Sequence, residues 1–587
     1  MTSPTLLFHT IRHLRPTQLL SRAYYRVADG LGNSSAWNRP SRDLEIGECD
    51  WRPRTGFLPP QRQRNSAAAI RQGRFCFQND ERFAGSPVGW NLAVAPLLWR
   101  YNLHYFDYLW SLDFDAGREI AEDWINRHPI GRGQVGWAPY PTSLRLLNWC
   151  AYFLGRHAEQ TRADSRFARK IQLSIGSQTA RLSCRLEYHL LGNHLLENAA
   201  ALVLVGSCFD GPGAGRWLEA GLRLLRRELQ EQILSDGMHF ELSPMYHSRI
   251  LYLILCLMNV VSDEVHDWLS GLAAKMLDAL ACTCHSDGQI ALLNDSALGV
   301  YNPLVELAEF AGRLGVPWEQ NAIQANTTFA LSNAGYFGAK TEQGHSVVCD
   351  AGKVGPDYIP GHAHGDIFSF ELSLFGDRLV VDSGVYDYLS GEMRGYCRST
   401  SAHNTVEIGG RDQCEFWDAF KVARRGRPCD VRFRKENWGF RLSGRHDGYR
   451  RQAGKPVHCR EFRWFHEGIL AVRDTVDSSV RTPAVSRIHL HPECVISEKM
   501  DESLVVERGD RRYALRFAGG KLRLGTFWYC PEFGIREKAS VIEFLSSGTE
   551  SRTAFCVAPS ELDVALDLRA EHDFVLHGHA NEAKSLV

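Results

Sequence analysis

Side-chain types that serve metal binding or proton transfer gather in one part of the chain. His362 and His364 lie in the segment 361–366, and Asp382 and His403 follow on the next segments. Imidazole and carboxylate are zinc ligands, and imidazole is the commonest acid–base group near neutral pH. On a strand, side chains two residues apart share a face, so we expect His362 and His364 to point the same way. The cluster predicts a metal site or a catalytic site.

A second set of polar residues lies on a predicted helix over residues 190–208. Asn193 and Glu197 are one helical turn apart on one face, and His194 lies three residues before Glu197. The rest of this helix is rich in Leu and Ala, and a buried polar group needs a hydrogen-bond partner. The three residues are therefore either functional or part of a hydrogen-bond network between helices.

A third set opens the next helix. Ser243 followed by Pro244 predicts a helix start, with the serine as N-cap and the proline at the first helical position. Tyr246 then falls in the first turn, where the helix dipole could lower its phenol pKa or favour an anionic ligand. The alternative is an ordinary packing contact of a tyrosine at a helix end. His239 and Glu241, just before this helix, are predicted to bind substrate.

Two arginines lie between Asp382 and His403 in a predicted loop rich in Gly and Ser. A guanidinium group is suited to forked hydrogen bonds with carboxylate or sulfate. Arg394 and Arg398 are therefore predicted to bind an acidic substrate. The alternative is ordinary surface charge.

The elements that must position these residues change character along the chain. From about residue 101 to 314 apolar residues recur at the helical period, as in 217–233 and 268–280. From about residue 327 short stretches alternate with period two instead. Residues 368–374 predict a strand with one buried face, and Gly376-Asp377 predicts the turn that follows it.

Further short strands are predicted at residues 405–408, 468–473 and 486–491. We therefore predict an α+β multidomain protein with three parts. Residues 1–90 form an arm that is helical and then irregular, 91–325 form a helical domain, and 326–587 form an antiparallel β-sandwich.

Composition narrows the class of protein. The chain has 587 residues and a net charge of -1, so its overall charge indicates neither a nucleic-acid ligand nor an anionic membrane. No stretch is apolar for long enough to predict a membrane span. Residues 1–30 resemble amphipathic helices and not a secretory signal, which predicts a cytoplasmic protein and leaves a periplasmic or surface-associated one open. The 16 cysteines are predicted to be mostly buried thiols.

Four short motifs, in this order, resemble those of the heparinase II/III family of polysaccharide lyases, which includes relatives that act on alginate. They are Asn193-His194-Leu195-Leu196-Glu197, Ser243-Pro244-Met245-Tyr246-His247, His362-Ala363-His364-Gly365-Asp366 and Ala402-His403-Asn404-Thr405. The resemblance covers roughly residues 100–420. It implies an incomplete (α/α) toroid followed by an antiparallel β-sandwich, in agreement with the periodicities.

The resemblance also implies a mechanism, β-elimination in a uronic-acid-containing polysaccharide. Asn193, with His194 or Glu197, would bind the uronate carboxylate, whose charge otherwise opposes removal of the C5 proton. Tyr246 and His362 would supply the base and the acid that protonates the leaving oxygen at C4.

By the same resemblance His364, Asp382 and His403 would hold a structural divalent metal, zinc by the ligand set. Two other functions remain open from the residues alone. One is a catalytically silent protein that binds an acidic glycan, and the other is a metal-dependent glycan hydrolase that uses the same three ligands. The polysaccharide and the oligomeric state are left open.

Overall fold

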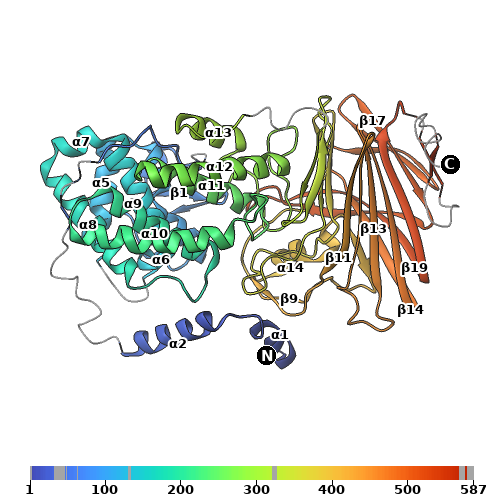
Figure 1. Ribbon diagram of the computed structural model, residues 1–587, viewed down its shortest axis with the longest axis horizontal. Helices are drawn as coiled ribbons and strands as arrows, with labels where there is room; N and C mark the ends of the chain where they lie inside the picture. The colour runs from blue at the N-terminus through green and yellow to red at the C-terminus, as the bar shows by residue number, and fades with distance from the viewer. Residues whose placement is uncertain are drawn as a thin grey trace.

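The computed structural model describes residues 3–31, 46–47, 49, 51–61, 64–129, 134–319, 327–562, 564–567 and 575–577. A helical domain is followed by a domain of antiparallel sheets, and a two-helix arm lies along one edge of both (Figure 1). This confirms the predicted α+β fold, an incomplete (α/α) toroid followed by a β-sandwich. Among the described residues, no helix is long and apolar enough to cross a bilayer.

The helices range from α6, α9 and α11, which are almost wholly buried, to α1, in which no residue is buried. The arm consists of α1 (Pro4–Ile11) and α2 (Pro16–Leu31). The helical domain contains α3 (Ala67–Arg71), α4 (Leu97–Tyr105), η1 (Asp107–Ser111), α5 (Phe114–Arg127), η2 (Val135–Trp137), α6 (Pro139–Trp149), η3 (Cys150–Arg156), α7 (Ala158–Ala163), α8 (Ser165–Ser183), α9 (Gly192–Cys208), α10 (Pro212–Gln232), α11 (Pro244–Met258), α12 (Asp263–Thr283) and α13 (Leu304–Arg313).

The two site-bearing helices, α9 and α11, lie inside the helical domain. Every residue of α11 is buried, and so are nearly all residues of α9. Helices that are apolar on all sides need other helices around them, and the toroid supplies that cover. The predicted start of α11 is confirmed, because the Ser243 side chain accepts a hydrogen bond from the Tyr246 N–H at 3.2 Å with Pro244 at the first position.

A short hairpin precedes the main helices. It consists of β1 (Arg74–Phe77) and β2 (Asp80–Phe83). Phe75 and Phe77 are buried in the same core as Trp99 and Tyr108 of the helical domain. This part of the predicted arm thus packs into the helical core, whereas α1 and α2 do not.

The sheet domain pairs a small sheet with a large one. The small sheet has the order β3 (Thr327–Leu331), β4 (Tyr336–Lys340), β5 (Ser346–Asp350), β6 (Phe370–Leu374), β7 (Asp377–Val380). The large sheet has the order β11 (Pro428–Glu436), β12 (Gly439–His446), β13 (Val457–Phe465), β14 (Ile469–His489), β19 (Glu537–Pro559), β17 (Arg511–Ala518), β16 (Ser503–Arg508), β15 (Val495–Met500), with β8 (Val406–Ile408) on β14 and β18 (Lys521–Tyr529) on β19.

The remaining elements are small: α14 (Glu392–Arg398), η5 (Thr400–Ala402), β9 (Phe416–Trp417), β10 (Lys421–Val422), β20 (Ala565–Asp567) and β21 (Val575–His577). Apolar side chains of the two main sheets share one core, in which Phe370 of β6 contacts Phe462 and Phe555 of the large sheet. The domain limits at residues 90 and 325 stay predictions; α13 ends at Arg313 and β3 begins at Thr327.

Several local predictions were wrong for reasons visible in the packing. Strand β6 is buried on both faces, because the helical domain covers the side opposite the large sheet. The strands predicted at 468–473 and 486–491 are the two ends of one strand, β14, whose middle is exposed and irregular. His362 and His364 lie in an irregular segment and not on a strand. Arg394 and Arg398 lie on the buried side of a short helix, α14, and not in a loop.

Candidate active site at the junction of the two domains

Tyr246 and His362 meet where the helical domain contacts the sheet domain. Their ring centroids are 4.0 Å apart and the ring planes are tilted by 33°, although one ring comes from α11 and the other from the irregular segment before β6. The Tyr246 hydroxyl is 3.2 Å from the Tyr388 hydroxyl. His362 keeps a small part of its ring accessible to solvent. The structure thus brings together the two residues predicted to exchange protons with substrate.

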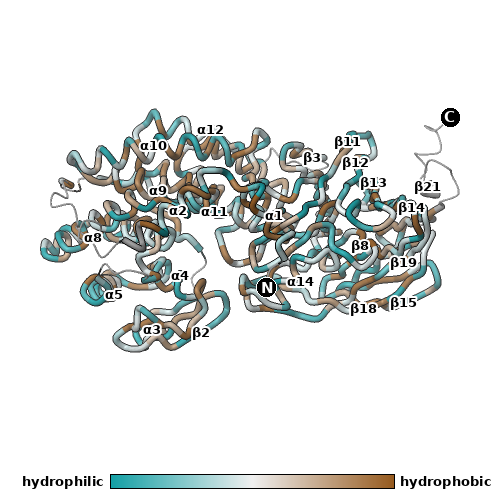
Figure 2. Tube along the Cα trace, turned by 90° about the horizontal axis from the view of Figure 1, so that it is seen from below, coloured by the Kyte–Doolittle hydropathy of each residue, from teal (hydrophilic) through white to brown (hydrophobic). Residues whose placement is uncertain are grey.

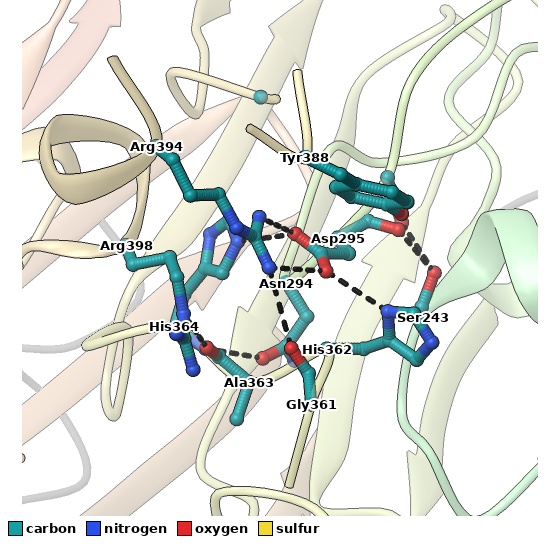
Figure 3. A network of polar contacts seen from close by, with 12 residues as sticks. Ser243, Asn294, Asp295, Gly361, His362, Ala363, His364, Tyr388, Arg394 and Arg398 are labelled. Atoms are coloured by element: carbon teal, nitrogen blue, oxygen red, sulfur yellow. Dashed lines mark hydrogen bonds and ion pairs between the residues drawn. The ribbon is translucent and has the colours of Figure 1, made fainter. Parts of the chain in front are cut away.

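The residue that organises this half of the site is Asp295, which the sequence interpretation missed. Its carboxylate accepts hydrogen bonds from Nδ1 of His362 at 2.9 Å and Nε2 of His364 at 2.8 Å, and Arg394 binds both its oxygens (Figure 3). Its backbone N–H donates to the His362 carbonyl at 3.0 Å, and its own carbonyl accepts from the Ser243 hydroxyl at 2.6 Å. Asp295 therefore fixes His362 relative to the first turn of α11.

The charges of this network are well defined. Burial alone would raise the pKa of Asp295, but Arg394 and the two histidine hydrogen bonds outweigh it and hold the pKa well below its usual range. Asp295 is thus a carboxylate, and its ion pair with Arg394 is fully buried. An acceptor at Nδ1 keeps a proton on that nitrogen, so the neutral His362 ring carries its lone pair on Nε2.

Tyr246 does not have the lowered pKa that its position at a helix start allowed. Burial, followed by the neighbouring Tyr388, raises its phenol pKa well above the usual value. Besides burial, the groups that act on the phenol are other tyrosines, Tyr388 first, and they raise its pKa further, so the helix dipole does not lower it. In this structure Tyr246 is a neutral phenol and a proton donor.

Glu241 links the two domains. One of its oxygens accepts from the Asn193 N–H at 3.1 Å, and the other lies 3.3 Å from Nε2 of His362. Gly192 permits this approach, since it has a φ of +57° and a Cβ there would lie 2.6 Å from the Glu241 carboxylate. The side-chain amide of Asn193 has no hydrogen-bond partner within the described part of the chain. It is therefore available to a ligand beside His362.

His194 lies on the same helix turn and carries positive charge more readily than an ordinary histidine. Its Nδ1 is 3.3 Å from Glu187, and its ring packs against Tyr140 at a tilt of 36° with centroids 4.3 Å apart. Burial lowers its pKa, but Glu187 and more distant carboxylates outweigh burial and raise it. Part of the side chain remains accessible, so a cation can face a ligand at this point.

The other predicted substrate-binding residues are engaged inside the protein. Glu197 forms a buried, forked ion pair with Arg249, with N–O distances of 2.6 and 3.0 Å. His239 is buried against Gln232. Arg398 bonds to backbone carbonyls, among them that of Ala363. The structure gives none of the three, nor Arg394, a free polar face toward solvent; a role in binding substrate stays a prediction for each.

The three predicted metal ligands are neighbours. His403 Nδ1 is 2.7 Å from Asp382, and the rings of His364 and His403 have centroids 5.3 Å apart. His364 Nδ1 and His403 Nε2 are buried without a partner. In type and place the residues fit a metal site, yet across the described residues no three such side chains are arranged as a ligand set. Asp382 raises the pKa of His403 to about 9 against the effect of burial, so a metal would have to displace a proton there.

Two site residues carried only a weak sequence signal. Asp295 stands in Asn294-Asp295-Ser296 directly after the apolar run 290–293, a polar group at the end of a buried segment. Tyr388 follows an Asp in a loop, and nothing in its surroundings distinguishes it from the other tyrosines. Both reach the site through contacts distant in sequence, which periodicity does not report.

Fold and site together define a class: an (α/α) toroid joined to a β-sandwich, with acid–base residues at the junction. Family models support this assignment. The one described as Heparinase II/III N-terminus matches residues 120–296, and the one described as Heparinase II/III-like, C-terminal, matches residues 324–583. The chain belongs to the heparinase II/III family.

Individual relatives agree. The chain is 26% identical over 322 residues to a heparin-sulfate lyase of Pedobacter heparinus, a match that covers 49% of this chain and 47% of the relative. A heparin-sulfate lyase of Bacteroides stercoris is 25% identical over 250 residues, covering 39% and 37%. The chain thus spans less than half the length of these curated relatives.

Solved structures show the same fold over nearly the whole chain. A crystal structure of heparinase III has a TM-score of 0.70 at 16% identity and covers 99% of both chains. A heparan sulfate lyase from Pedobacter heparinus has a TM-score of 0.60 at 17% identity, covering 96% of this chain and 93% of that one.

Proposed function

We propose that this protein is a polysaccharide lyase that cleaves a uronic-acid-containing chain by β-elimination and leaves a 4,5-unsaturated uronate end. The observation that carries this proposal is the close pair of Tyr246 and His362 beside the Asn193 amide, which has no partner among the described residues. A proton donor, a proton acceptor and a carboxylate-binding group are the three parts that the reaction needs.

The first requirement is to make the C5 proton removable. The uronate carboxylate resists a second negative charge on the adjacent carbon, so it must be neutralised by fixed donors. The free amide of Asn193 and the cationic tendency of His194 supply such donors on neighbouring positions of α9. Fixed donors of this kind contribute about 3–4 kcal/mol to transition-state stabilisation in other enzymes.

The second requirement is a base and an acid. His362 takes the C5 proton through Nε2, because Nδ1 is held by Asp295. Glu241, 3.3 Å from Nε2, then stabilises the imidazolium that forms. Tyr246, held as a neutral phenol by burial, protonates the oxygen that leaves C4. In an alternative form of this scheme Tyr246 acts as both base and acid, and His362 only orients it.

The test is a panel of uronic-acid polysaccharides followed by the ultraviolet absorbance of the new double bond. Tyr246→Phe and His362→Gln should each lower the rate by about two orders of magnitude or more. Tyr513→Phe and His157→Gln are matched controls, because both residues lie away from the site. Unchanged rates in Tyr246→Phe and His362→Gln would refute the assignment of these two residues.

The same assay separates the two alternative functions. A catalytically silent glycan-binding protein would bind an acidic polysaccharide saturably and form no double bond. A hydrolase would release new reducing ends without ultraviolet absorbance and would lose activity at once on chelation. The curated relatives are named for heparin-sulfate, which makes that polysaccharide the first member of the panel.

We also propose that His364, Asp382 and His403 hold a structural divalent metal, zinc by their chemistry. The support is the pair of buried ring nitrogens without partners. A bound ion would cross-link the segment that carries His362 to η5 and β7. Elemental analysis should find about one zinc per chain, and chelation should lower the melting temperature in the wild type but not in His364→Ala/His403→Ala. No zinc, with full stability, would refute the site.

The cytoplasmic location drawn from residues 1–30 likewise remains a proposal. Fractionation of the native host would test it.

A further inference from the structure

In the two helices of the N-terminal arm, several large apolar side chains are exposed, and the one described side chain that is fully buried is polar. On a surface helix, apolar residues normally face the core and polar ones face solvent. In α1 no residue is buried. In α2 the one fully buried side chain of the described positions is the polar Gln18, 2% exposed, which donates to the carbonyls of Leu190 and Tyr358.

Polar contacts also make the other attachments of the arm. Arg15 pairs with Glu231 and lies over the Tyr358 ring, with its guanidinium carbon 3.7 Å from the centroid. Thr10 accepts a hydrogen bond from the Trp417 indole at 3.0 Å. The arm thus contacts both domains, α2 the helical one and α1 the sheet domain (Figure 1). Tyr25 also attaches the arm, since its hydroxyl donates to the Leu186 carbonyl and its ring lies against His189 and Arg185.

Most large apolar residues of the arm are exposed, although Leu20 and Tyr24 also line a hollow against Leu186 and Tyr188 of the helical domain. We call the exposed ones the arm stripe: Leu7, Phe8, Ile11, Leu19, Leu20, Tyr24 and Val27. Leu20, Tyr24 and Val27 recur at the helical spacing, so they line one side of α2. Leu20 is 69% exposed and Phe8 63%. Figure 2, which views the molecule from the arm's edge, shows apolar colour along α1. Contiguous exposed apolar side chains of this kind mark a binding surface.

The charged residues of the arm are mostly basic, with Asp29 near the end of α2 as the exception. Residues 1–28 contain four arginines and no Asp or Glu, although the whole chain has a net charge of -1. Arg12, Arg22 and Arg26 are exposed, and none forms an ion pair with a carboxylate in the part of the chain that the structure describes. Exposed leucine and aromatic side chains flanked by unpaired arginines suit the boundary between acyl chains and anionic headgroups.

We propose that the arm docks the protein on an anionic lipid surface, with the arm stripe in the acyl–headgroup boundary and the arginines on the headgroups. A protein partner with an apolar surface would not need the unpaired arginines, and a second copy of this chain would bring those like charges together. Docking leaves the body in water and places the junction of the two domains beside the membrane. The proposal is independent of the lyase chemistry, since no residue of the stripe belongs to the active site.

The experiment uses the full chain and sedimentation with vesicles. Vesicles of phosphatidylcholine with about one third phosphatidylglycerol should bind the protein, and pure phosphatidylcholine should bind it about tenfold or more weakly. Phe8→Glu/Leu20→Glu should reduce binding to the anionic vesicles about tenfold or more, and Arg22→Gln/Arg26→Gln should reduce it and weaken its salt dependence. Val94→Glu, at a site 83% exposed and outside the arm, is the matched control and should bind normally.

Circular dichroism and double-bond formation from a soluble substrate should be unchanged in all these variants, because the altered side chains are exposed. Absence of binding to anionic vesicles at low salt would overturn the proposal. So would binding that survives both arm variants. Concentration-dependent self-association that Leu20→Glu abolishes, without vesicle binding, would show instead that a second copy covers the stripe.

Discussion

The two halves of the site differ in how much of their hydrogen-bonding capacity the protein itself uses. On the helical side, the Asn193 amide is unbonded within the described residues and His194 is partly accessible. The other side is called the sheet side because His362, His364 and Arg394 come from the sheet domain, and it also includes Asp295, from the helical-domain segment between α12 and α13. Asp295, Arg394 and His364 are buried and bonded to one another. Only His362 on that side retains an accessible edge.

A cluster of histidines and carboxylates therefore does not by itself mean that many of its members act on substrate. Most of the histidines and carboxylates around His362 hold one another in place, which is the costlier arrangement to build because each buried charge must be paired. The sparse polar residues of α9 are the ones left free for a ligand. If this division is right, changes on the sheet side should reduce both stability and activity, and changes on the helical side activity alone.

The largest combined effect is expected for Asp295→Asn. The variant leaves Arg394 buried without a counter-charge and removes the acceptor that holds His362, so we expect a loss of about 3–5 kcal/mol in stability and of about two or more orders of magnitude in rate. Denaturant unfolding and the double-bond assay measure the two losses.

Asp287→Asn is the matched control for this change. It also removes an aspartate paired with an arginine, Arg378, but it is part-exposed and far from the acid–base pair. It should cost less stability and leave the rate intact. An Asp295→Asn protein of normal stability would show that the sheet side is not the frame that we describe.

Asn193→Ala should show the reverse pattern. Its amide forms no internal hydrogen bond in the described structure, so unfolding should change by less than about 1 kcal/mol while the rate falls about a hundredfold. On the same helix Asn198 donates to Ser143 and Glu187 and accepts from the Glu187 N–H. Asn198→Ala should therefore cost about 1–3 kcal/mol of stability. Equal stability losses in Asn193→Ala and Asn198→Ala would contradict the view that the Asn193 amide is not used inside the protein.

Whether a feature could be predicted from the sequence depends on whether neighbouring or distant residues determine it. Ser243-Pro244 predicted the start of α11, because capping depends on neighbouring residues. The helical and period-two patterns predicted the two kinds of domain. They failed for β6 and β14, since the first is covered on both faces and the second stays a single strand across an exposed irregularity.

The motifs pointed to part of the candidate site and missed Asp295 and Tyr388. The motifs located Tyr246 and His362, but the partners that define their chemistry come from elsewhere in the chain. Asp295 lies 67 residues from His362 in sequence. Glu197 pairs with Arg249, 52 residues away. Such pairings, and the pKa shifts that burial imposes, arise from packing and have no local signature.

A smaller effect is expected at His247, a buried histidine in α11 on the helical side. His247 accepts from the His239 N–H and contacts the Met276 carbonyl, and burial lowers its pKa to about 4. The unfolded chain binds this proton near pH 6.5, so its contribution is complete above that pH and is lost as pH falls toward 4. The loss is on the order of 3 kcal/mol.

Unfolding free energies of the wild type and His247→Gln at pH 7.5, 6 and 5 measure it. The glutamine can still donate to the Met276 carbonyl but does not titrate, so the difference between the two proteins should shrink as pH falls. Parallel pH dependence would assign the acid sensitivity to other buried histidines.

The smallest effect is expected for Tyr388→Phe, which probes the contact between the two halves. The Tyr388 hydroxyl is the one described partner of the Tyr246 hydroxyl, and its ring lies under Arg394 at 4.9 Å. Phenylalanine keeps the ring and removes a single hydrogen bond, worth about 1 kcal/mol, so kcat should change by about fivefold or less and stability by a similar small amount. Since the change leaves Tyr246 able to donate, a loss as large as that of Tyr246→Phe would mean that Tyr388 itself transfers the proton, and the acid would then belong to the sheet side.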